Sequence, residues 1–205
     1  MPVVALDFET ANEGRASACA AGLAWIDGRR LERVEEWLIR PSEMRFSGMN
    51  IAIHGIHPEH VAGKPEFPDF WGQTLAGHED LFILAHNASF DMSVLRASLT
   101  LYGLPWPCLS YLCTVTVART LWPDMDNHKL PTVSEHLGID LEHHRAGSDA
   151  EACALIALAA MEEVGAKSVG QLAAKLGITA GEIRPYGYRP CRAGQRVKGR
   201  QAVRV

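Results

Sequence analysis

Features that mark membrane and secreted proteins are missing from this 205-residue sequence. No apolar run approaches the roughly 18 residues that a helix needs to span a bilayer. The segment Met1–Val4 has no basic stretch ahead of an apolar one, so we expect no secretory signal and no membrane association. The five cysteines are scattered, odd in number and without the spacing of a metal site: Cys19, Cys108, Cys113, Cys153 and Cys191. Reduced thiols and a cytoplasmic location are therefore expected.

Internal repeats and low-complexity tracts are also absent. Hydrophobic residues make up 47% of the chain and charged residues 21%, which is ordinary for a globular protein. The length suits one full domain with a small appendage. We place the main domain over residues 1–165, and a small helical segment with a basic C-terminal tail over residues 166–205.

Acidic residues are missing from the C-terminal end. Seven basic residues follow Ile183: Arg184, Arg189, Arg192, Arg196, Lys198, Arg200 and Arg204. They leave 13 of the 20 basic residues to balance all 24 acidic ones, so the body of the protein is strongly acidic. Such a body repels nucleic acid unless bound cations or the tail compensate. Tyr186 and Tyr188 could stack on bases, although a solvated or partly disordered tail that balances charge is the simpler interpretation.

Hydrophobic periodicity predicts an α/β fold. Strands are expected over residues 3–9, 17–26, 31–40, 81–85 and 109–113, with Asp27-Gly28 as a hairpin turn. Helices are expected over residues 67–76, 88–102, 114–121, 132–137, 148–164 and 171–176. Three consecutive strands followed by strand–helix alternation favour a mixed sheet with helices on its faces.

Two acidic residues lie close together in the first predicted strand. Asp7 and Glu9 are two positions apart, so their side chains share one face, while Phe8 points to the other. Carboxylates that share a buried face repel each other unless a proton or a cation intervenes. The alternative is a strand end at which both acids face water.

Two further acidic residues each lie at the start of the apolar face of a predicted helix. Asp91 lies in the first turn of the helix that follows residues 81–85, where an acid also favours the helix dipole. Asp149 lies in the segment Ser148–Glu151, which has the pattern of a capping box with Ser148 as the N-cap. Because the cap leaves Asp149 unassigned, we expect it to point toward the same sheet edge as the first two acids.

A cluster of four carboxylates needs compensation, and divalent cations provide it. Oxygen ligands without cysteine select Mg²⁺ or Mn²⁺ over Zn²⁺, and two such ions can support phosphodiester hydrolysis. His144, five residues before Asp149, is a candidate general base because histidine titrates near neutral pH. The adjacent His143 is the competing candidate, and loop histidines are often only solvent-exposed.

Three short motifs occur in a fixed order: Asp7-x-Glu9, His86-Asn87-x-x-Phe90-Asp91 and His144-x-x-x-x-Asp149. Together they resemble the DEDD-type 3′–5′ exonucleases with a histidine in the last motif (DEDDh), a group that includes the proofreading epsilon subunit of bacterial DNA polymerase III and ribonuclease T. The opening Asp7–Thr10 and the segment Ile51–Ile56 are also typical of this group. The resemblance covers residues 3–165, which implies that this part is the exonuclease catalytic domain.

The resemblance implies a ribonuclease H-like fold, with a five-stranded mixed sheet whose first three strands are antiparallel. It implies that two Mg²⁺ or Mn²⁺ ions are bound by Asp7, Glu9, Asp91 and Asp149, and that His144 is the general base. By the same resemblance, the contacts to the 3′-terminal nucleotide are Thr10, His54, Asn87 and Phe90. Thr10 could instead satisfy backbone groups only, and Phe90 could be a core residue.

The implied activity is hydrolysis of single-stranded DNA, or of RNA, from the 3′ end to nucleoside 5′-monophosphates. The expected partners are single-stranded 3′ ends and a DNA polymerase, although no clamp-binding peptide is present. Two alternatives stay open at this point. One is an RNA 3′-end trimming enzyme like ribonuclease T, and the other is a non-catalytic module that binds a nucleic-acid end or a polymerase.

Overall fold

The computed structural model describes residues 1–78 and 80–194. A seven-stranded sheet forms its centre, in the order β3-β2-β1-β4-β5-β7-β8. Its strands are β1 (Val3–Thr10), β2 (Ala18–Asp27), β3 (Arg30–Leu38), β4 (Phe82–Ala85), β5 (Leu109–Cys113), β7 (Gly181–Arg184) and β8 (Gly187–Arg189). Two further short strands, β6 (Ile178–Thr179) and β9 (Arg192–Ala193), pair with each other.

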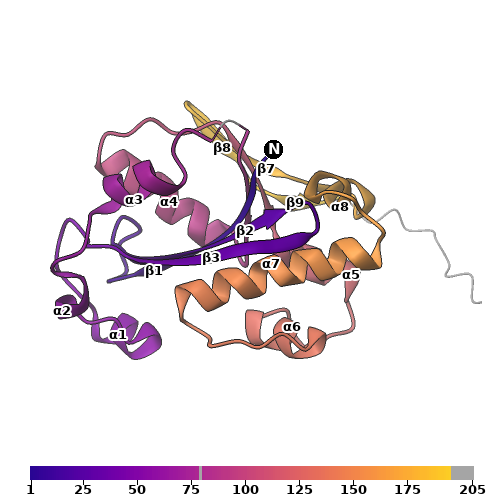
Figure 1. The fold of residues 1–205 in the computed structure, drawn as a ribbon, viewed down its shortest axis with the longest axis horizontal. Coiled ribbons are helices and arrows are strands. Elements are labelled where there is room, and N and C mark those ends of the chain that lie inside the picture. The colour runs from indigo at the N-terminus through magenta and orange to yellow at the C-terminus, as the bar shows by residue number, and fades with distance from the viewer. Residues whose placement is uncertain (79, 195–205) are drawn as a thin grey trace, which may run out of the picture.

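Helices flank the sheet on both sides (Figure 1). They are α1 (Gly48–His54), α2 (Pro58–Val61), α3 (Phe67–Thr74), α4 (Ser89–Leu101), α5 (Thr114–Leu121), α6 (Leu130–Leu137), α7 (Ala146–Glu163) and α8 (Val169–Lys175). None of the helices in residues 1–78 and 80–194 combines the length and apolar character that crossing a bilayer requires.

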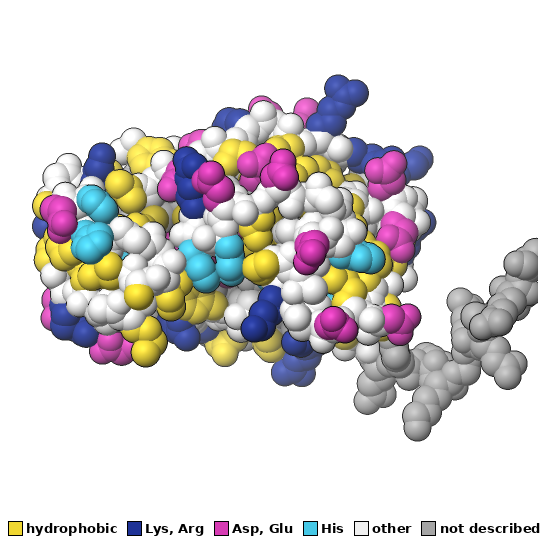
Figure 2. Space-filling view, turned by 90° about the horizontal axis from the view of Figure 1, so that it is seen from below, with side chains coloured by type: hydrophobic (Ala, Val, Ile, Leu, Met, Phe, Trp, Pro, Cys, Tyr) yellow, Lys and Arg dark blue, Asp and Glu magenta, His cyan; other side chains and the backbone are white. Residues whose placement is uncertain are grey.

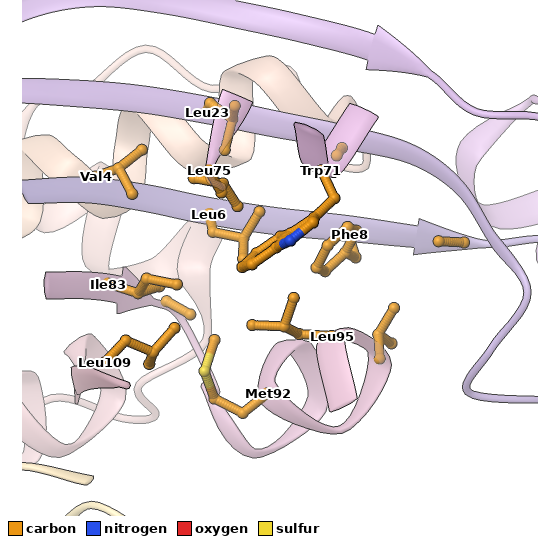
Figure 3. Packing of buried hydrophobic residues seen from close by; sticks show 14 of the residues in the cluster. Val4, Leu6, Phe8, Leu23, Trp71, Leu75, Ile83, Met92, Leu95 and Leu109 are labelled. Carbon is orange, nitrogen blue, oxygen red and sulfur yellow. The ribbon is translucent and has the colours of Figure 1, made fainter. Parts of the chain in front are cut away.

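The two faces of β1 are built from different kinds of side chain. On one face, Leu6 and Phe8 point toward Trp71 and Leu95 of the helices α3 and α4 (Figure 3). Phe8 lies 6.0 Å from Phe70, measured between ring centroids, in an edge-to-face arrangement. Such aromatic burial is the largest apolar contribution that a small core can make, so β1 is firmly fixed at the centre of the sheet.

Small residues line the opposite face, where α7 packs against β1 and β2. β2 reads ACAAGLAWID, and α7 carries a run of buried alanines. Gly22 is the closest approach, because a Cβ at this position would lie 1.8 Å from the Ala146 carbonyl oxygen. The absence of a side chain at Gly22 therefore lets the first turn of α7 lie directly on the sheet.

The α/β class and the mixed sheet are confirmed: β1, β2 and β3 are antiparallel, and β4 and β5 run parallel to β1. The predicted number of five strands is wrong, because β7 pairs with β5 and β8 pairs with β7. β7 has only four residues, and Gly181 leaves the space that the Tyr111 ring fills. So short a strand, interrupted by glycine and charge, gives no readable alternation.

The C-terminal end differs from its interpretation as a solvated or partly disordered tail. Residues 184–193 contribute to three strands, whereas residues 195–205 lie outside the described part of the chain. The division into domains at residue 165 stays a prediction.

Two local predictions are also corrected. α7 begins at Ala146 with Arg145 as its N-cap, so Ser148 is not a cap and the proposed capping box does not exist. The Ser148 hydroxyl instead accepts a hydrogen bond from the Glu142 backbone N–H at 2.9 Å. The helices α1 and α2 were not expected, because their segment is rich in proline, glycine and histidine.

Candidate active site

All nine residues proposed from the sequence line one cavity of ≈ 670 Å³, and these are Asp7, Glu9, Thr10, His54, Asn87, Phe90, Asp91, His144 and Asp149. Asp7 and Glu9 come from β1, and Asp91 and Asp149 from the first turns of α4 and α7. One carboxylate oxygen each of Asp7, Glu9 and Asp149 lie within 4.8 Å of one another. The fold therefore brings together groups that are up to 142 positions apart in the chain.

Asp149 reaches the cluster because of the close packing at Gly22. Asp7 and Gly22 are direct partners in the antiparallel pair of β1 and β2. Since α7 begins on top of Gly22, its first turn passes beside Asp7. Its N-terminal N–H groups carry positive partial charge toward this end of the sheet, which favours an acid there.

The Asp91 side chain accepts a backbone hydrogen bond from β1 beyond the point at which the neighbouring strand β4 stops pairing. β4 pairs with β1 only as far as Ala5, so the backbone of β1 runs on past the end of its neighbour. The Phe8 backbone N–H, in this stretch that β4 leaves unpaired, donates to Asp91 Oδ1 at 3.0 Å. The carboxylate thus satisfies a buried donor that the sheet leaves unpaired, and its position is fixed by the backbone.

The carboxylates resist ionisation in the metal-free protein. Burial raises the pKa of Asp7 well above its usual range, and the charges of Asp91, Asp149 and Glu9 add to this effect. Burial, followed by the charges of Asp149 and Asp91, raises the pKa of Glu9 to about 8. Burial also raises the pKa of Asp91 to about 7, against the lowering effect of the Phe8 hydrogen bond. The cluster therefore requires protons or cations to be stable.

Two adjacent histidines lie over the cluster, with stacked rings 3.7 Å apart between centroids. His143 Nδ1 lies 3.2 Å from Asp149 Oδ2, whereas His144 donates its backbone N–H to the same oxygen at 3.0 Å. The His144 ring faces Glu9, with 4.0 Å between Nδ1 and Oε1. Burial lowers the pKa of His144, which keeps its ring neutral near pH 7. His144 has a φ of 69°, a left-handed conformation that is uncommon for histidine and is concentrated at functional sites.

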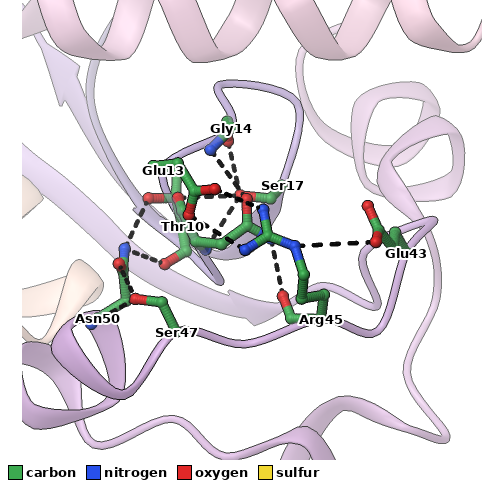
Figure 4. Close-up of polar contacts among 9 residues, drawn as sticks. Thr10, Glu13, Gly14, Ser17, Glu43, Arg45, Ser47 and Asn50 are labelled. Carbon is green, nitrogen blue, oxygen red and sulfur yellow. Dashed lines mark hydrogen bonds and ion pairs between the residues drawn. The ribbon is translucent and has the colours of Figure 1, made fainter.

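The end of β1 is held by a polar network (Figure 4). Asn50 donates through Nδ2 to the Thr10 carbonyl at 2.8 Å and to Thr10 Oγ1 at 3.2 Å. Arg45, in the segment after β3, binds both carboxylate oxygens of Glu13 at 2.8 and 3.2 Å. This pair connects that segment to the loop between β1 and β2. Thr10 thus accepts hydrogen bonds that hold β1 to α1, as expected if its role is structural. It also lines the cavity.

The predicted substrate contacts that line the cavity are themselves uncharged side chains. His54 accepts the Ile56 N–H at Nδ1, so Nε2 carries the proton and donates to the Thr10 carbonyl at 3.1 Å. Burial lowers the pKa of His54, which favours this neutral form. Phe90 packs partly against the core, and its ring is covered by the Arg15 guanidinium at 4.4 Å. Both roles considered for Phe90 are therefore compatible with its position.

Sequence reasoning missed the opposite side of the cavity. It is formed by α5, by the start of α6 and by the loop between them, and it contributes Arg119, Asn127, His128 and Lys129. His86 belonged to a recognised motif but had no assigned role. No spacing rule marks these residues, because they meet the acids only through the folding of β5 and α5.

Comparison with known proteins agrees with this geometry. The family model described as Exonuclease (RNase T) matches residues 4–157, which is most of the chain. The chain belongs to this exonuclease family. The resemblance to 3′–5′ exonucleases is thereby confirmed at the level of the family.

The relatives of this exonuclease by sequence are much longer proteins. DNA polymerase III PolC-type of Listeria innocua is 33% identical over 138 residues, which is 67% of this chain and 9% of the relative. The protein of the same name from Caldanaerobacter subterraneus is 29% identical over 155 residues, which is 74% of this chain and 11% of the relative. The chain thus spans about a tenth of the length of these curated relatives.

Solved structures share the fold. Exonuclease X in complex with 5′-overhanging duplex DNA is 26% identical, with a TM-score of 0.67 over 85% of this chain and 99% of that one. The nuclease domain of 3′hExo, a DEDDh family member bound to rAMP, is 18% identical, with a TM-score of 0.66 over 79% and 92% of the two chains. The ribonuclease H-like architecture is thereby confirmed.

Proposed function

We propose that this exonuclease hydrolyses single-stranded nucleic acid from its 3′ end, in a metal-dependent reaction that releases nucleoside 5′-monophosphates. The observation that carries the proposal is the convergence of four carboxylates in one cavity, where burial raises the pKa of each one and repulsion between the acids adds to this effect at Asp7, Glu9 and Asp91. A scaffold that only bound nucleic acid would gain nothing from acids that repel phosphate, so a non-catalytic module is disfavoured.

The donor set fits hard divalent cations. Asp7, Glu9, Asp91 and Asp149 offer only oxygen atoms, which suits two ions of Mg²⁺ or Mn²⁺. When bound, such ions lower the pKa of a water and neutralise the phosphodiester at the reacting centre. The backbone bonds that Asp91 and Asp149 accept fix both acids in place before any ion binds.

We assign the general base to His144. Its neutral ring can accept a proton near pH 7, and its left-handed backbone holds it over the acid cluster. The contact of His143 with Asp149 suits a different task, namely to orient that carboxylate. The DEDDh spacing of four residues between histidine and aspartate supports the same assignment.

The 3′-terminal nucleoside fits the uncharged side of the cavity. Thr10, His54, Asn87 and Phe90 present polar and aromatic groups without charge, which suits a sugar and a base. One solved relative is named as bound to duplex DNA, and another as recognising the 3′ end of a histone mRNA stem-loop. The proposal therefore covers both DNA and RNA as substrates.

The test uses matched single-stranded DNA and RNA oligonucleotides, each labelled at the 5′ end. The proposal expects a ladder that shortens by single nucleotides in Mg²⁺ or Mn²⁺, with no reaction in EDTA. A circular single strand should resist the enzyme, and a 3′-phosphate should slow it. Internal cuts in the circle, or full activity in EDTA, would contradict the proposal. Preference for the RNA strand would favour an RNA-trimming role instead.

A DNA polymerase remains the proposed protein partner, because the sequence relatives carry the matching region within a polymerase. The cytoplasmic location also stays a prediction. Co-purification of a DNA polymerase with the full chain from native cells would test the partner, and fractionation of those cells would test the location.

A further inference from the structure

The two sides of the cavity differ in charge, and this difference suggests how a strand lies in it. On the α1 side the lining residues are Asn50, Ile53 and the neutral His54. On the α5–α6 side they include two cations, Arg119 and Lys129. α1 and α6 lie on either side of the first turn of α7 (Figure 1), and the space-filling view shows a hollow there with histidines at its rim (Figure 2).

Neither cation is neutralised by the protein. Arg119 and Lys129 are exposed, and within residues 1–78 and 80–194 neither forms an ion pair. By contrast, Arg45 is held by Glu13 and Glu43, although it lies in the same acidic body. Two free cations beside an acid cluster form a boundary at which a polyanion can approach the cluster.

Asn127 adds a directed donor between them. Its Oδ1 accepts the Lys129 backbone N–H at 3.0 Å and the Thr132 hydroxyl at 2.8 Å, which fixes the orientation of the amide. The Nδ2 group has no hydrogen-bond partner among the described residues. It is therefore free to donate to a phosphate oxygen.

The loop that carries this donor is fastened to the motif that carries Asp91. His86 donates through Nε2 to the His128 carbonyl at 3.0 Å, while His86 Nδ1 accepts from the Thr114 hydroxyl at 3.0 Å. His128 in turn donates to the Trp122 carbonyl at 2.9 Å. These bonds hold the α5–α6 loop at a fixed place relative to the carboxylates.

We infer that Arg119, Asn127 and Lys129 form a backbone-binding wall for the phosphates immediately 5′ of the scissile linkage. This inference rests on the proposed function and adds a direction to it. The terminal nucleoside occupies the uncharged α1 side, the scissile phosphate meets the carboxylates, and the rest of the strand leaves along the α5–α6 side. Because this wall contacts phosphates rather than base edges, it is indifferent to sequence.

Binding is tested in Ca²⁺ with a fluorescent single-stranded oligonucleotide whose 3′-terminal linkage is non-hydrolysable, so that the wild-type protein, with all four carboxylates, can serve as the parent. Adding Arg119→Ala and Lys129→Ala should raise the Kd about tenfold. It should also reduce the slope of log K against log salt concentration by about 0.7 for each lost phosphate contact. Adding Asn127→Asp should weaken binding as well, because it keeps the Oδ1 acceptor and replaces the donor with a charge. The matched control is Arg29→Ala with Arg30→Ala, at the opposite end of β2.

A methylphosphonate, which is uncharged, locates the contact. Placed at the first or second linkage 5′ of the scissile one, it should weaken binding by the parent but have little further effect on the Arg119→Ala/Lys129→Ala protein. Equal losses in both proteins, or an unchanged Kd in the double variant, would overturn the inference. If the wild-type enzyme cleaves no single strand at all, the proposed function fails first, so the two failures are distinguishable.

Discussion

Acidic residues meet opposite surroundings at the β7–β8 edge of the sheet and at its central strand β1. In the β7–β8 hairpin, Glu182 lies between Arg184 and Arg189, at 3.2 and 3.0 Å. In the cavity, Glu9 is more deeply buried, yet its nearest basic group is the neutral His144 ring at 4.0 Å. Arg119 and Lys129 line the same cavity, but neither forms an ion pair with these acids in the described part of the chain. This difference supports the proposal that the cavity acids are compensated by ions from solution.

Removing one carboxylate from the cavity should have the largest effect of the changes considered. Asp7→Asn should lower turnover by at least about 10³-fold, because several kcal/mol of metal-assisted stabilisation are lost. The same change should leave the metal-free fold intact or raise its Tm, since it relieves repulsion from three neighbouring acids. Turnover and thermal unfolding in EDTA check both statements, with the exposed Asp69→Asn as the control. Retained activity would refute the role of Asp7.

The two stacked histidines provide the next test. His144→Ala should lower the rate about 10²–10⁴-fold, the usual contribution of a general base. His143→Ala should have a much smaller effect, because its ring contacts Asp149 rather than the open cavity. Single-turnover rates measured from pH 6 to 9 separate the two. If the variants exchange their effects, His143 is the base and the assignment from spacing is wrong.

The pH dependence of stability should distinguish the cavity from the hairpin. Glu9 has a folded pKa of about 8 against an ordinary 4.5, so the folded state holds its proton more tightly than the unfolded state. Its contribution to stability is therefore present at low pH and is lost as the pH rises toward 8. In EDTA, the free energy of unfolding of wild type should fall relative to that of Glu9→Gln between pH 5 and 8, by on the order of a few kcal/mol at about 1.4 kcal/mol per pKa unit. Saturating Mn²⁺ should remove this difference, whereas a constant difference in EDTA would contradict it.

The basic residues at the C-terminal end fall into two groups, those in or next to β7, β8 and β9 and those in residues 195–205. Removing residues 195–205 keeps β7, β8 and β9 and deletes four basic residues, namely Arg196, Lys198, Arg200 and Arg204. The deletion should raise KM for long oligonucleotides and flatten the salt dependence by about 0.7 for each lost phosphate contact. Turnover of a dinucleotide should change little. An unchanged salt slope would assign these residues to charge balance.

The smallest effect is expected at the hairpin itself. Glu182→Gln removes both ion pairs of a side chain that is 30% exposed. Exposed pairs contribute little, so the free energy of unfolding should fall by about 0–1 kcal/mol, and less at high salt. Chemical denaturation at low and high ionic strength measures this. A loss as large as that from a core substitution would show that the hairpin depends on its charges.

The sequence predicted most of what depends on local pattern. The strand at residues 109–113 and the helix at residues 114–121 were placed at their observed ends, because the apolar periodicity is clear there even though Thr and Val make up most of the helix. The acid cluster was predicted from motif spacing, and its nine proposed residues line one cavity. The function of each residue remains a proposal.

Features that depend on long-range contacts were not predictable. β7 forms only because Gly181 accommodates the Tyr111 ring, a contact between residues 70 positions apart. The backbone-binding wall meets the acids through the His86–His128 bond, which no spacing rule reveals. The start of α7 at Ala146 depends on Gly22 in β2 and not on the apparent cap at Ser148.

The central claim, that the cavity acids are built for divalent cations, is tested most directly by calorimetric titration of Mn²⁺ into the metal-free enzyme with a nucleoside 5′-monophosphate present. Repeating the titration in buffers of different ionisation enthalpy counts the protons released. The account predicts two ions per chain, with net proton release at pH 7, because Asp7, Glu9 and Asp91 hold protons that the ions displace. Asp7→Asn should lose most of the binding. Titration without proton release, or equal binding by Asp7→Asn, would contradict the account.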